Sequence, residues 1–281
     1  MPTIRRATRD DAPALVTLCR ASVGPDDYVP DFVVDFLATG VVFVAEESGR
    51  AVGMMVYHDV PDGSVWLHAA RTHPDHRQRG VATALVRSCE DLARERHRNA
   101  LRLWADASNH PSVAANRKYG FHERARFTRM RVPASRRAPE VRLEPLDLAN
   151  DWPALEVSPL LRQSARYVFH DFYFIPLNRD NAEWLGREGA LWRFGAHAVS
   201  VSEDFEGVRG KDLQVQLLAG DPAAILRAAP AIAHARGADR VESFLPHDRE
   251  VLETAREAGF ELMDWGREAV LFEKPLPANA P

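Results

Sequence analysis

The sequence has few of the features that mark secreted, membrane-spanning or metal-binding proteins. Its 281 residues include two cysteines, Cys19 and Cys89, which allow neither a disulfide framework nor a cysteine-based metal site. No apolar run approaches the length that crosses a bilayer. No apolar segment follows Met1-Pro2-Thr3-Ile4, as it would in a signal peptide. We therefore expect a cytoplasmic protein with buried free thiols and no metal.

The charge balance excludes other classes of partner. The formal net charge is −4, and no basic patch is interleaved with aromatic residues, so we expect neither nucleic acid nor a membrane surface as a partner. The hydrophobic fraction of 46% is sufficient for substantial cores. The length suggests two domains of ordinary size.

A basic turn between a strand and a helix is the most informative stretch. The apolar run 65–70 predicts a strand, and apolar residues at spacings of three and four after Val81 predict a helix. Between them lie Arg77, Arg79 and Gly80. A helix start offers free N–H groups, and glycine lets the backbone approach a ligand closely. The pattern indicates a phosphate site, although an ordinary surface turn with solvated arginines has the same composition.

The phrase Arg77-x-x-Gly80-x-Ala82 resembles the Q/R-x-x-G-x-G/A motif of the GNAT superfamily of N-acetyltransferases. In that family the turn cradles the pyrophosphate of acetyl-CoA. The resemblance therefore implies acetyl-CoA as co-substrate. The residues it implies for binding are Ala70, Arg71, Thr72, Arg77, Gln78, Arg79, Gly80, Val81, Ala82, Thr83, Asn109 and Asn116.

A second phrase, Asn109-x6-Asn116-x3-Gly120-Phe121, resembles the later GNAT signature that ends in Gly-Phe. The expected elements also follow the family's order. They are strands over 3–7, 41–46, 51–58, 65–70, 100–105 and 123–132, and helical patterns from 10, over 28–37, over 81–96 and over 109–118. We expect a GNAT domain over residues 1–134.

The second half repeats this order after a proline-rich, charged linker at 135–140. Strands are expected over 141–146, 190–194, 197–203, 213–218, 240–245 and 269–272, and helices over 152–161, 222–236 and 248–258. Asp221-Pro222 stands where the first half has its phosphate turn. An acid repels phosphate and proline lacks a donor, so this place predicts a plain helix start. The aromatic run 167–174 is either an edge or core strand or an apolar wall of the acceptor pocket.

The expected fold class is therefore α+β, with two GNAT-like domains. Each is a mixed, mainly antiparallel, twisted sheet flanked by helices. Residues 1–134 would bind acetyl-CoA, and residues 141–281 would be a degenerate copy without the pyrophosphate loop.

The candidate catalytic residues are His68, Asn116 and Tyr119. Many GNAT members carry a tyrosine as general acid four residues before the signature glycine, and this sequence has Asn116 there. Tyr119 is a nearby substitute or a core residue, and water is a third source of the proton. His68, on the strand before the turn, is a candidate base, with Glu46 and His58 as weaker ones. A backbone N–H near 70–72 would polarise the thioester oxygen.

Together these features predict direct acetyl transfer to the amine of a small molecule. The alternative is a catalytically silent acyl-CoA-binding or interaction protein, because Asn116 replaces the usual acid and the second half is degenerate. We expect a monomer or a homodimer. The sequence leaves the acceptor open.

Overall fold

The computed structural model describes residues 2–203 and 211–277, and the chain forms two compact units. Unit 1 comprises Met1–Leu103, Ala115–His122 and Phe272–Pro281, and unit 2 comprises Trp104–Ala114 and Glu123–Leu271. The sequence-based boundary at 135–140 stays a prediction about domains. The compact units differ from it, because Phe272–Pro281 belong to unit 1 whereas Trp104–Ala114 and the residues from Glu123 onward belong to unit 2.

Unit 1 is built on a mainly antiparallel sheet. Its strands are β1 (Thr3–Arg6), β2 (Val41–Glu47), β3 (Arg50–Asp59), β4 (Val65–Thr72) and the start of β5 (Ala100–Asp106). They lie side by side in the order β1-β2-β3-β4-β5, and β4 and β5 are parallel. The last residues of β15 (Glu268–Pro275) follow beyond β5, where the Leu276 N–H donates to the Asn99 carbonyl at 2.8 Å.

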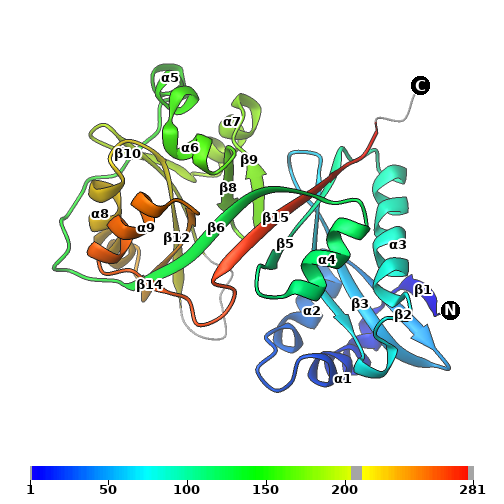
Figure 1. Cartoon of the computed structure of the whole chain (residues 1–281). Coiled ribbons are helices and arrows are strands. Elements are labelled where there is room, and N and C mark those ends of the chain that lie inside the picture. The colour runs from blue at the N-terminus through cyan, green and yellow to red at the C-terminus, as the bar shows by residue number, and fades with distance from the viewer. Residues whose placement is uncertain (1, 204–210, 278–281) are drawn as a thin grey trace. The chain divides into compact units, whose positions relative to one another are not determined.

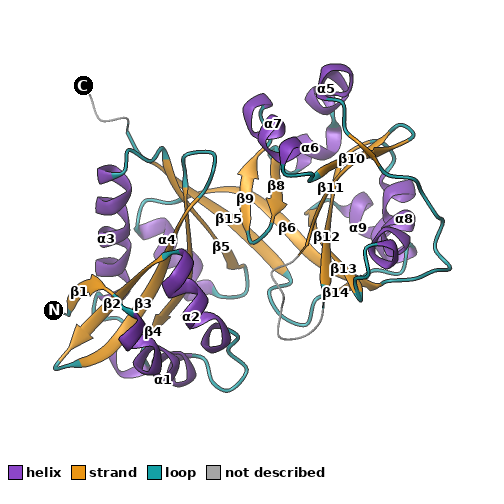
Figure 2. Ribbon diagram, turned by 180° about the vertical axis from the view of Figure 1, so that it is seen from behind, coloured by secondary structure: helices purple, strands orange, loops and turns teal. Residues whose placement is uncertain are grey.

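The helices of unit 1 cover both faces of this sheet (Figures 1 and 2). They are the 3₁₀ turn η1 (Arg9–Asp11), α1 (Ala12–Ser22), α2 (Val29–Thr39), the 3₁₀ turn η2 (Pro74–His76), α3 (Val81–Glu95) and the end of α4 (His110–Lys118). Val44 and Met54 pack against α1 and α2. Gly53, the next residue along β3, faces α3. Successive strand residues point to opposite faces, so one sheet separates α1–α2 from α3.

Gly53 sets how closely α3 approaches the sheet. A Cβ placed on Gly53 would lie 2.5 Å from the Val81 side chain and 3.2 Å from that of Leu85. Only glycine fits at such a distance, so the backbone of β3 at Gly53 is in direct contact with the side chains of the first turns of α3.

Buried charge fixes the end of the chain to unit 1. The Arg102 guanidinium donates to Glu273 at 2.6 Å, to Ser64 at 2.9 Å and also to Asp62. The side chains of Arg102 and Asp62 are 6% and 4% exposed. On the neighbouring residue, Lys274 Nζ donates to Glu90 at 2.7 Å and to the Tyr119 carbonyl at 3.1 Å. Charges buried this deeply stay ionised only while they are paired.

The strands of unit 2 are arranged as a mixed sheet and a separate hairpin. Its strands are β6 (His122–Pro133), β7 (Glu144–Pro145), β10 (Leu191–Phe194), β11 (His197–Glu203), β12 (Asp212–Ala219), β13 (Arg240–Pro246) and β14 (Glu261–Leu262), with β8 (Tyr167–His170) and β9 (Tyr173–Pro176) in the hairpin. The order is β6-β13-β12-β11-β10-β7, and β12 and β13 are parallel, like β4 and β5 in unit 1.

Two cores cover the faces of this sheet. The helices are α5 (Leu148–Val157), α6 (Pro159–Gln163), α7 (Arg179–Arg187), α8 (Pro222–Ala235) and α9 (Arg249–Glu257). Ile225 and Val251, on α8 and α9, share one core with Val215, whereas Leu155 and Leu185, on α5 and α7, share the other. No helix in residues 2–203 or 211–277 is long and apolar enough to cross a membrane.

Most expected elements are present, and the differences occur in unit 2. The strand expected over 141–146 is reduced to Glu144–Pro145, and the helix expected over 152–161 is two helices separated at Ser158. Helix α7 was not predicted. The aromatic run 167–174 folds back on itself as β8 and β9, and its rings are largely buried, which agrees with the core interpretation. Phe169 stacks on Phe244 at 4.1 Å between ring centroids.

We predict that Arg102→Met lowers the free energy of unfolding by about 3–5 kcal/mol, because it leaves two buried carboxylates, Asp62 and Glu273, without their cation. Denaturant unfolding followed by circular dichroism measures the change. Arg50→Met, at an exposed position in unit 1, is the matched control and is expected to change it by less than about 0.5 kcal/mol. Equal effects of the two substitutions would contradict the role of the buried pair.

Candidate functional site

The basic turn joins β4 to α3, as the sequence predicted (Figure 1). Gln78 and Gly80 both have left-handed backbone, with φ of 60° and 82°. The Gly80 position is open, because a Cβ there would meet no atom within 4 Å. The two left-handed residues turn the chain sharply, so that α3 starts at Val81 with Gly80 as its N-cap.

The N-terminus of α3 carries no side-chain cap. Its first helical bond runs from the Ala84 N–H to the Gly80 carbonyl, so the amides of Val81, Ala82 and Thr83 have no acceptor within the helix. These amides and the helix dipole form a site for an anion. The opening above Gly80 gives a ligand access to it.

Helix α8 shows the opposite arrangement at the corresponding place in unit 2. The Asp221 carboxylate accepts hydrogen bonds from the N–H groups of Ala223 at 3.0 Å and Ala224 at 3.2 Å. The helix start is thus already occupied by a negative charge. This confirms the prediction that Asp221-Pro222 is a plain capped helix start.

The two arginines of the turn have different neighbours. The Arg77 guanidinium donates to the Ser22 carbonyl at 2.7 Å, which ties the turn to the end of α1. Arg79 lies 3.6 Å from Glu47, which also pairs with His76 at 2.9 Å, and the Arg79 side chain is 57% exposed. Arg77 therefore positions the turn, and Arg79 is the more accessible cation.

Strand β4 is distorted just before the turn. Ala69 has φ of 51°, and the register with β3 shifts between Met54 and Val56. A left-handed alanine costs about 1–3 kcal/mol and commonly marks a bulge. The bulge changes the direction of the strand over 70–72, where a backbone N–H was expected to polarise the thioester oxygen.

The amide of Thr72 faces away from β3. The His73 N–H donates to the Val52 carbonyl on β3 at 2.9 Å, and successive N–H groups of a strand alternate in direction. On the other side of β4, the pairing with β5 includes Val65 and Trp66 and none of the described residues 67–72. The N–H of Thr72 can therefore donate to a ligand, as an oxyanion site requires.

His68 lies on β4 against α2. Its ring meets that of Phe36 edge-on at 4.9 Å, and the ring of His58 is 6.5 Å away. Burial, with the neighbouring His58 and Arg71, lowers the pKa of His68 to about 3. Burial also lowers the pKa of His58. A neutral imidazole with so low a pKa is a weak base, so the assignment of His68 as the base stays a prediction.

Arg71 was expected in the acetyl-CoA set, and its guanidinium is engaged by Asp27. Nε donates to Oδ2 of this buried carboxylate at 2.8 Å, and Nη2 contacts Oδ1. The guanidinium carbon also lies 5.9 Å from the centre of the Tyr28 ring. Arg71 thus holds the segment before α2 against β4, on the face of the sheet that carries His68.

Helix α4 brings the two other catalytic candidates into different environments. Asn116 is 7% exposed, and its carbonyl accepts the N–H groups of Tyr119 and Phe121, each at 3.1 Å. Tyr119 lines a cavity of about 200 Å³ together with Thr83 of the basic turn's helix. Asn109 caps the start of α4, because its Oδ1 accepts the Ser112 N–H at 3.2 Å.

The other residues that line this cavity are Val86, Arg87, Glu90, Lys118 and Lys274. No signal in the sequence indicated Lys274 as a residue of this cavity. Lys274 comes from the end of the chain and enters unit 1 only because the last residues of β15 pair beside β5. No local sequence pattern predicts that segments so far apart along the chain lie side by side.

The thiols are unsuited to covalent chemistry. Burial raises the pKa of Cys19 to about 11 and raises that of Cys89 as well, which keeps both protonated at neutral pH. In residues 2–203 and 211–277, no group of three His, Cys, Asp or Glu side chains is placed to hold a metal ion.

Comparison with known proteins identifies the segment that contains this turn. Residues 10–121 match the model of the Acetyltransferase (GNAT) family. This part of the chain is a GNAT-family domain. An uncharacterized N-acetyltransferase of Methanocaldococcus jannaschii is 28% identical over 88 residues, which are 29% of this chain and 39% of that relative. The chain thus matches well under half the length of this curated relative.

Solved structures extend the likeness in fold to the whole chain. A GCN5-related N-acetyltransferase from Sphaerobacter thermophilus gives a TM-score of 0.61 at 15% identity, covering 97% of this chain and 95% of that one. A tandem GNAT protein from the clavulanic acid biosynthesis pathway gives 0.56 at 17% identity, covering 99% and 100%. A Thermoplasma acidophilum protein assigned as an acetyltransferase gives 0.64 at 18% identity, covering 98% and 100%. The expected tandem GNAT-like fold is confirmed.

We predict that His68 makes the folded protein sensitive to acid. Its pKa is about 3 when folded and about 6.5 when unfolded, so the unfolded state binds the proton first as the pH falls. Stability due to the neutral ring is complete above pH 6.5 and is lost at about 1.4 kcal/mol per pH unit between pH 6 and 4. His68→Gln is expected to flatten this slope in denaturant titrations at each pH.

Proposed function

We propose that the chain is an acetyl-CoA-dependent N-acetyltransferase that transfers the acetyl group directly to the amine of a small molecule. The observation that carries the proposal is the uncapped start of α3 behind the open Gly80 position, within the segment that matches the GNAT family. The relatives are similar in sequence only over part of the chain, so the acceptor is proposed at the level of chemical class.

The described residues fit a pyrophosphate at this turn. The amides of Val81, Ala82 and Thr83 are free to donate, and Arg79 supplies an exposed positive charge. The close contact of Gly53 with Val81 holds these amides rigidly on the sheet. The further cavity beside α3, with Arg87, is a place for the more distant part of the same molecule.

Acetyl-CoA supplies an activated thioester. The protein positions this thioester, stabilises the charge that develops on its oxygen and provides a route for the amine proton. The N–H of Thr72 is directed to stabilise the negative charge that develops on the thioester oxygen. The attacking amine must be neutral. Since the pKa of His68 is about 3 and burial also lowers that of His58, the proposed route for the amine proton is a water chain that passes these rings and ends at a more exposed group.

Tyr119 is the proposed donor to the departing thiolate. A phenol has a proton to give, whereas the amide of Asn116 does not donate as an acid at neutral pH. Tyr119 lines the cavity that Thr83 also lines, whereas Asn116 is buried in α4. This assignment moves the acid by three residues along the helix, which is close to one turn.

A silent acyl-CoA-binding protein is the second candidate. Two observations favour it: an asparagine occupies the usual place of the acid, and the histidine on β4 has a pKa of about 3. Both functions need the same phosphate turn. They differ in whether an amine is ever acetylated.

We predict that Gly80→Asp weakens coenzyme A binding about ten- to hundredfold more than Gly80→Asn does. Both side chains fit the open, left-handed position, but only aspartate places a negative charge at the start of α3, as Asp221 does at α8. Calorimetric titration with coenzyme A measures the difference. Similar affinities for the two variants would show that the turn does not bind the pyrophosphate.

We also expect acetyl-CoA to release free thiol when an accepted amine is supplied from a panel of small amines. Tyr119→Phe should lower kcat about 100-fold with little change in the KM for acetyl-CoA, because a general acid contributes about that much. Thiol release is followed with a disulfide reagent. If coenzyme A raises the melting temperature of the wild type but no amine releases thiol, the silent function replaces the enzymatic one.

A further inference from the structure

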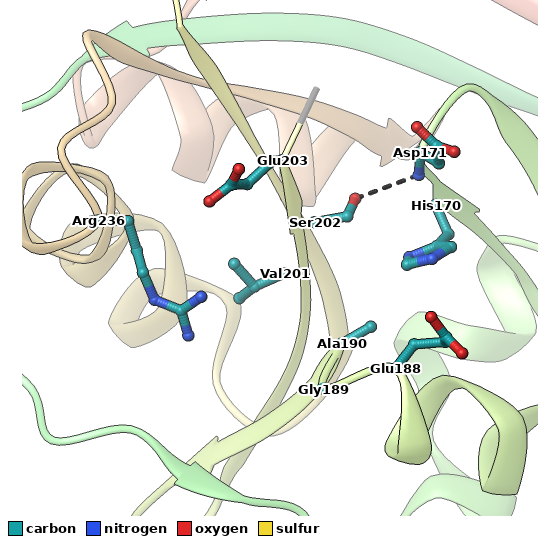
Figure 3. Close-up of a pocket in the computed structure, with 9 residues that line it drawn as sticks. All are labelled: His170, Asp171, Glu188, Gly189, Ala190, Val201, Ser202, Glu203 and Arg236. Atoms are coloured by element: carbon teal, nitrogen blue, oxygen red, sulfur yellow. Dashed lines mark hydrogen bonds between the residues drawn. The ribbon is translucent and has the colours of Figure 1, made fainter. Parts of the chain in front are cut away.

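Unit 2 contains a cavity of its own, about 340 Å³ in volume, that the acetyl-transfer site does not use. Figure 3 shows it around the end of β11. It is lined by His170, Asp171, Glu188, Gly189, Ala190, Val201, Ser202, Glu203 and Arg236. Its lining therefore combines a guanidinium, an imidazole, a hydroxyl and three carboxylates. Such a mixture is unusual for a packing defect, which is normally apolar.

Arg236 supplies the positive charge of the cavity. It is the C-cap of α8, and its guanidinium carbon lies 4.7 Å from the centre of the Trp192 ring. In the part of the chain that the structure describes, no carboxylate lies within ion-pair distance of it. A guanidinium placed over an indole keeps its hydrogen-bond donors available, and its fork matches a carboxylate.

Three carboxylates supply the negative charge: Asp171 and Glu188 lie on one side of β11, and Figure 3 shows Glu203 on the side of Arg236. Among residues 2–203 and 211–277 none of the three has a cationic partner, and burial raises the pKa of Asp171. His170 adds an acceptor or donor, since its Nδ1 is buried and has no hydrogen-bond partner among the described residues. In Figure 3 His170 lies on the side of Asp171 and Glu188, across β11 from Arg236.

The side of the cavity with Asp171 is held in place by the hairpin. Asp171 is at the turn between β8 and β9, with φ of 59°, and its N–H donates to Ser202 Oγ on β11 at 3.3 Å. The His170 ring packs edge-on against Trp184 at 5.3 Å. The acid and the imidazole are thus presented by fixed elements rather than by a free loop.

From these unpaired charges of both signs we infer that the cavity binds a small zwitterion of the amino acid class, whose carboxylate pairs with Arg236 and whose ammonium group pairs with Asp171 and Glu188. A ligand with both charges pairs with the guanidinium and with carboxylates at once, which neither a simple amine nor a simple acid does. The inference concerns unit 2 alone and does not depend on the proposed acetyl transfer.

The first experiment titrates the intact protein, without acetyl-CoA, with zwitterions of increasing charge separation. The probes are alanine, β-alanine, 4-aminobutyrate and 6-aminohexanoate, followed by calorimetry. For the best probe, the amide and the N-acetyl derivative each remove one charge. We expect either derivative to bind about ten- to hundredfold more weakly, since each loses one charged hydrogen-bonded contact.

Substitutions test which residue pairs with each charged end of the ligand. Arg236→Met should weaken binding of the free zwitterion about tenfold or more and leave the weak binding of the amide unchanged. Glu188→Gln should also weaken binding of the free zwitterion about tenfold or more and leave the weak binding of the N-acetyl form unchanged. Glu188 is exposed, so its substitution does not endanger folding. Arg249→Met, at a cation of unit 2 that is 90% exposed and outside the cavity lining, is the matched control.

Two outcomes would overturn the inference. One is that no probe binds at millimolar concentration, and the other is that the amide binds as tightly as the free zwitterion in both wild type and Arg236→Met. Gly80→Asp serves as a further control, because it impairs the proposed acetyl-CoA turn and should leave zwitterion binding intact. Failure of the proposed function and failure of this inference are therefore distinguishable.

Discussion

The contact between the Gly53 backbone and the Val81 side chain is the constraint on which the candidate site depends. It brings the first turn of α3 so close to β3 that no side chain fits at position 53. The helix start is then fixed on the sheet, and the turn before it must reverse in few residues, which Gln78 and Gly80 do with left-handed backbone. Free amides at a rigid helix start are preorganised for an anion, so binding needs little further ordering. The strain at the turn is tolerated because the packing of α3 compensates for it.

The corresponding helix in unit 2 shows how little sequence separates a phosphate site from a closed helix end. Both helices follow a central strand and precede a strand parallel to it. The start of α3 is glycine with no capping side chain, and the start of α8 is Asp221, whose carboxylate uses the amides itself. A single residue type at the N-cap therefore decides whether the dipole and amides of the helix are available to a ligand. The two units keep the same order of elements because the packing of strands and helices does not depend on that residue.

The sequence predicted the elements of unit 1 well because their signals are local. Hydrophobic periodicity sets β2, β3 and α3, and Arg77-x-x-Gly80-x-Ala82 marks the turn. Signals were weaker in unit 2, where Ser158-Pro159 divides one expected helix and two turn residues divide the aromatic run into a hairpin. The placement of Lys274 beside Glu90 and Tyr119 could not be predicted, since it depends on which strand the end of the chain joins. The pKa of His68 could not be predicted from the sequence either, because it depends on burial against Phe36 and not on the neighbours of His68 in sequence.

The low pKa of His68 follows from its burial and not from the residue type alone. A histidine on the surface would titrate near neutrality and suit a general base, but the same side chain packed against Phe36 and near Arg71 holds its proton only in strong acid. The sheet face that carries His68 also carries the Arg71–Asp27 pair, in which both charges are already compensated. In the proposed reaction the amine proton then leaves through water to a more exposed group, and the protein contributes mainly through positioning and the Thr72 amide. Such a site stabilises developing charge with backbone dipoles, which need no titration and act over the whole pH range in which the fold persists.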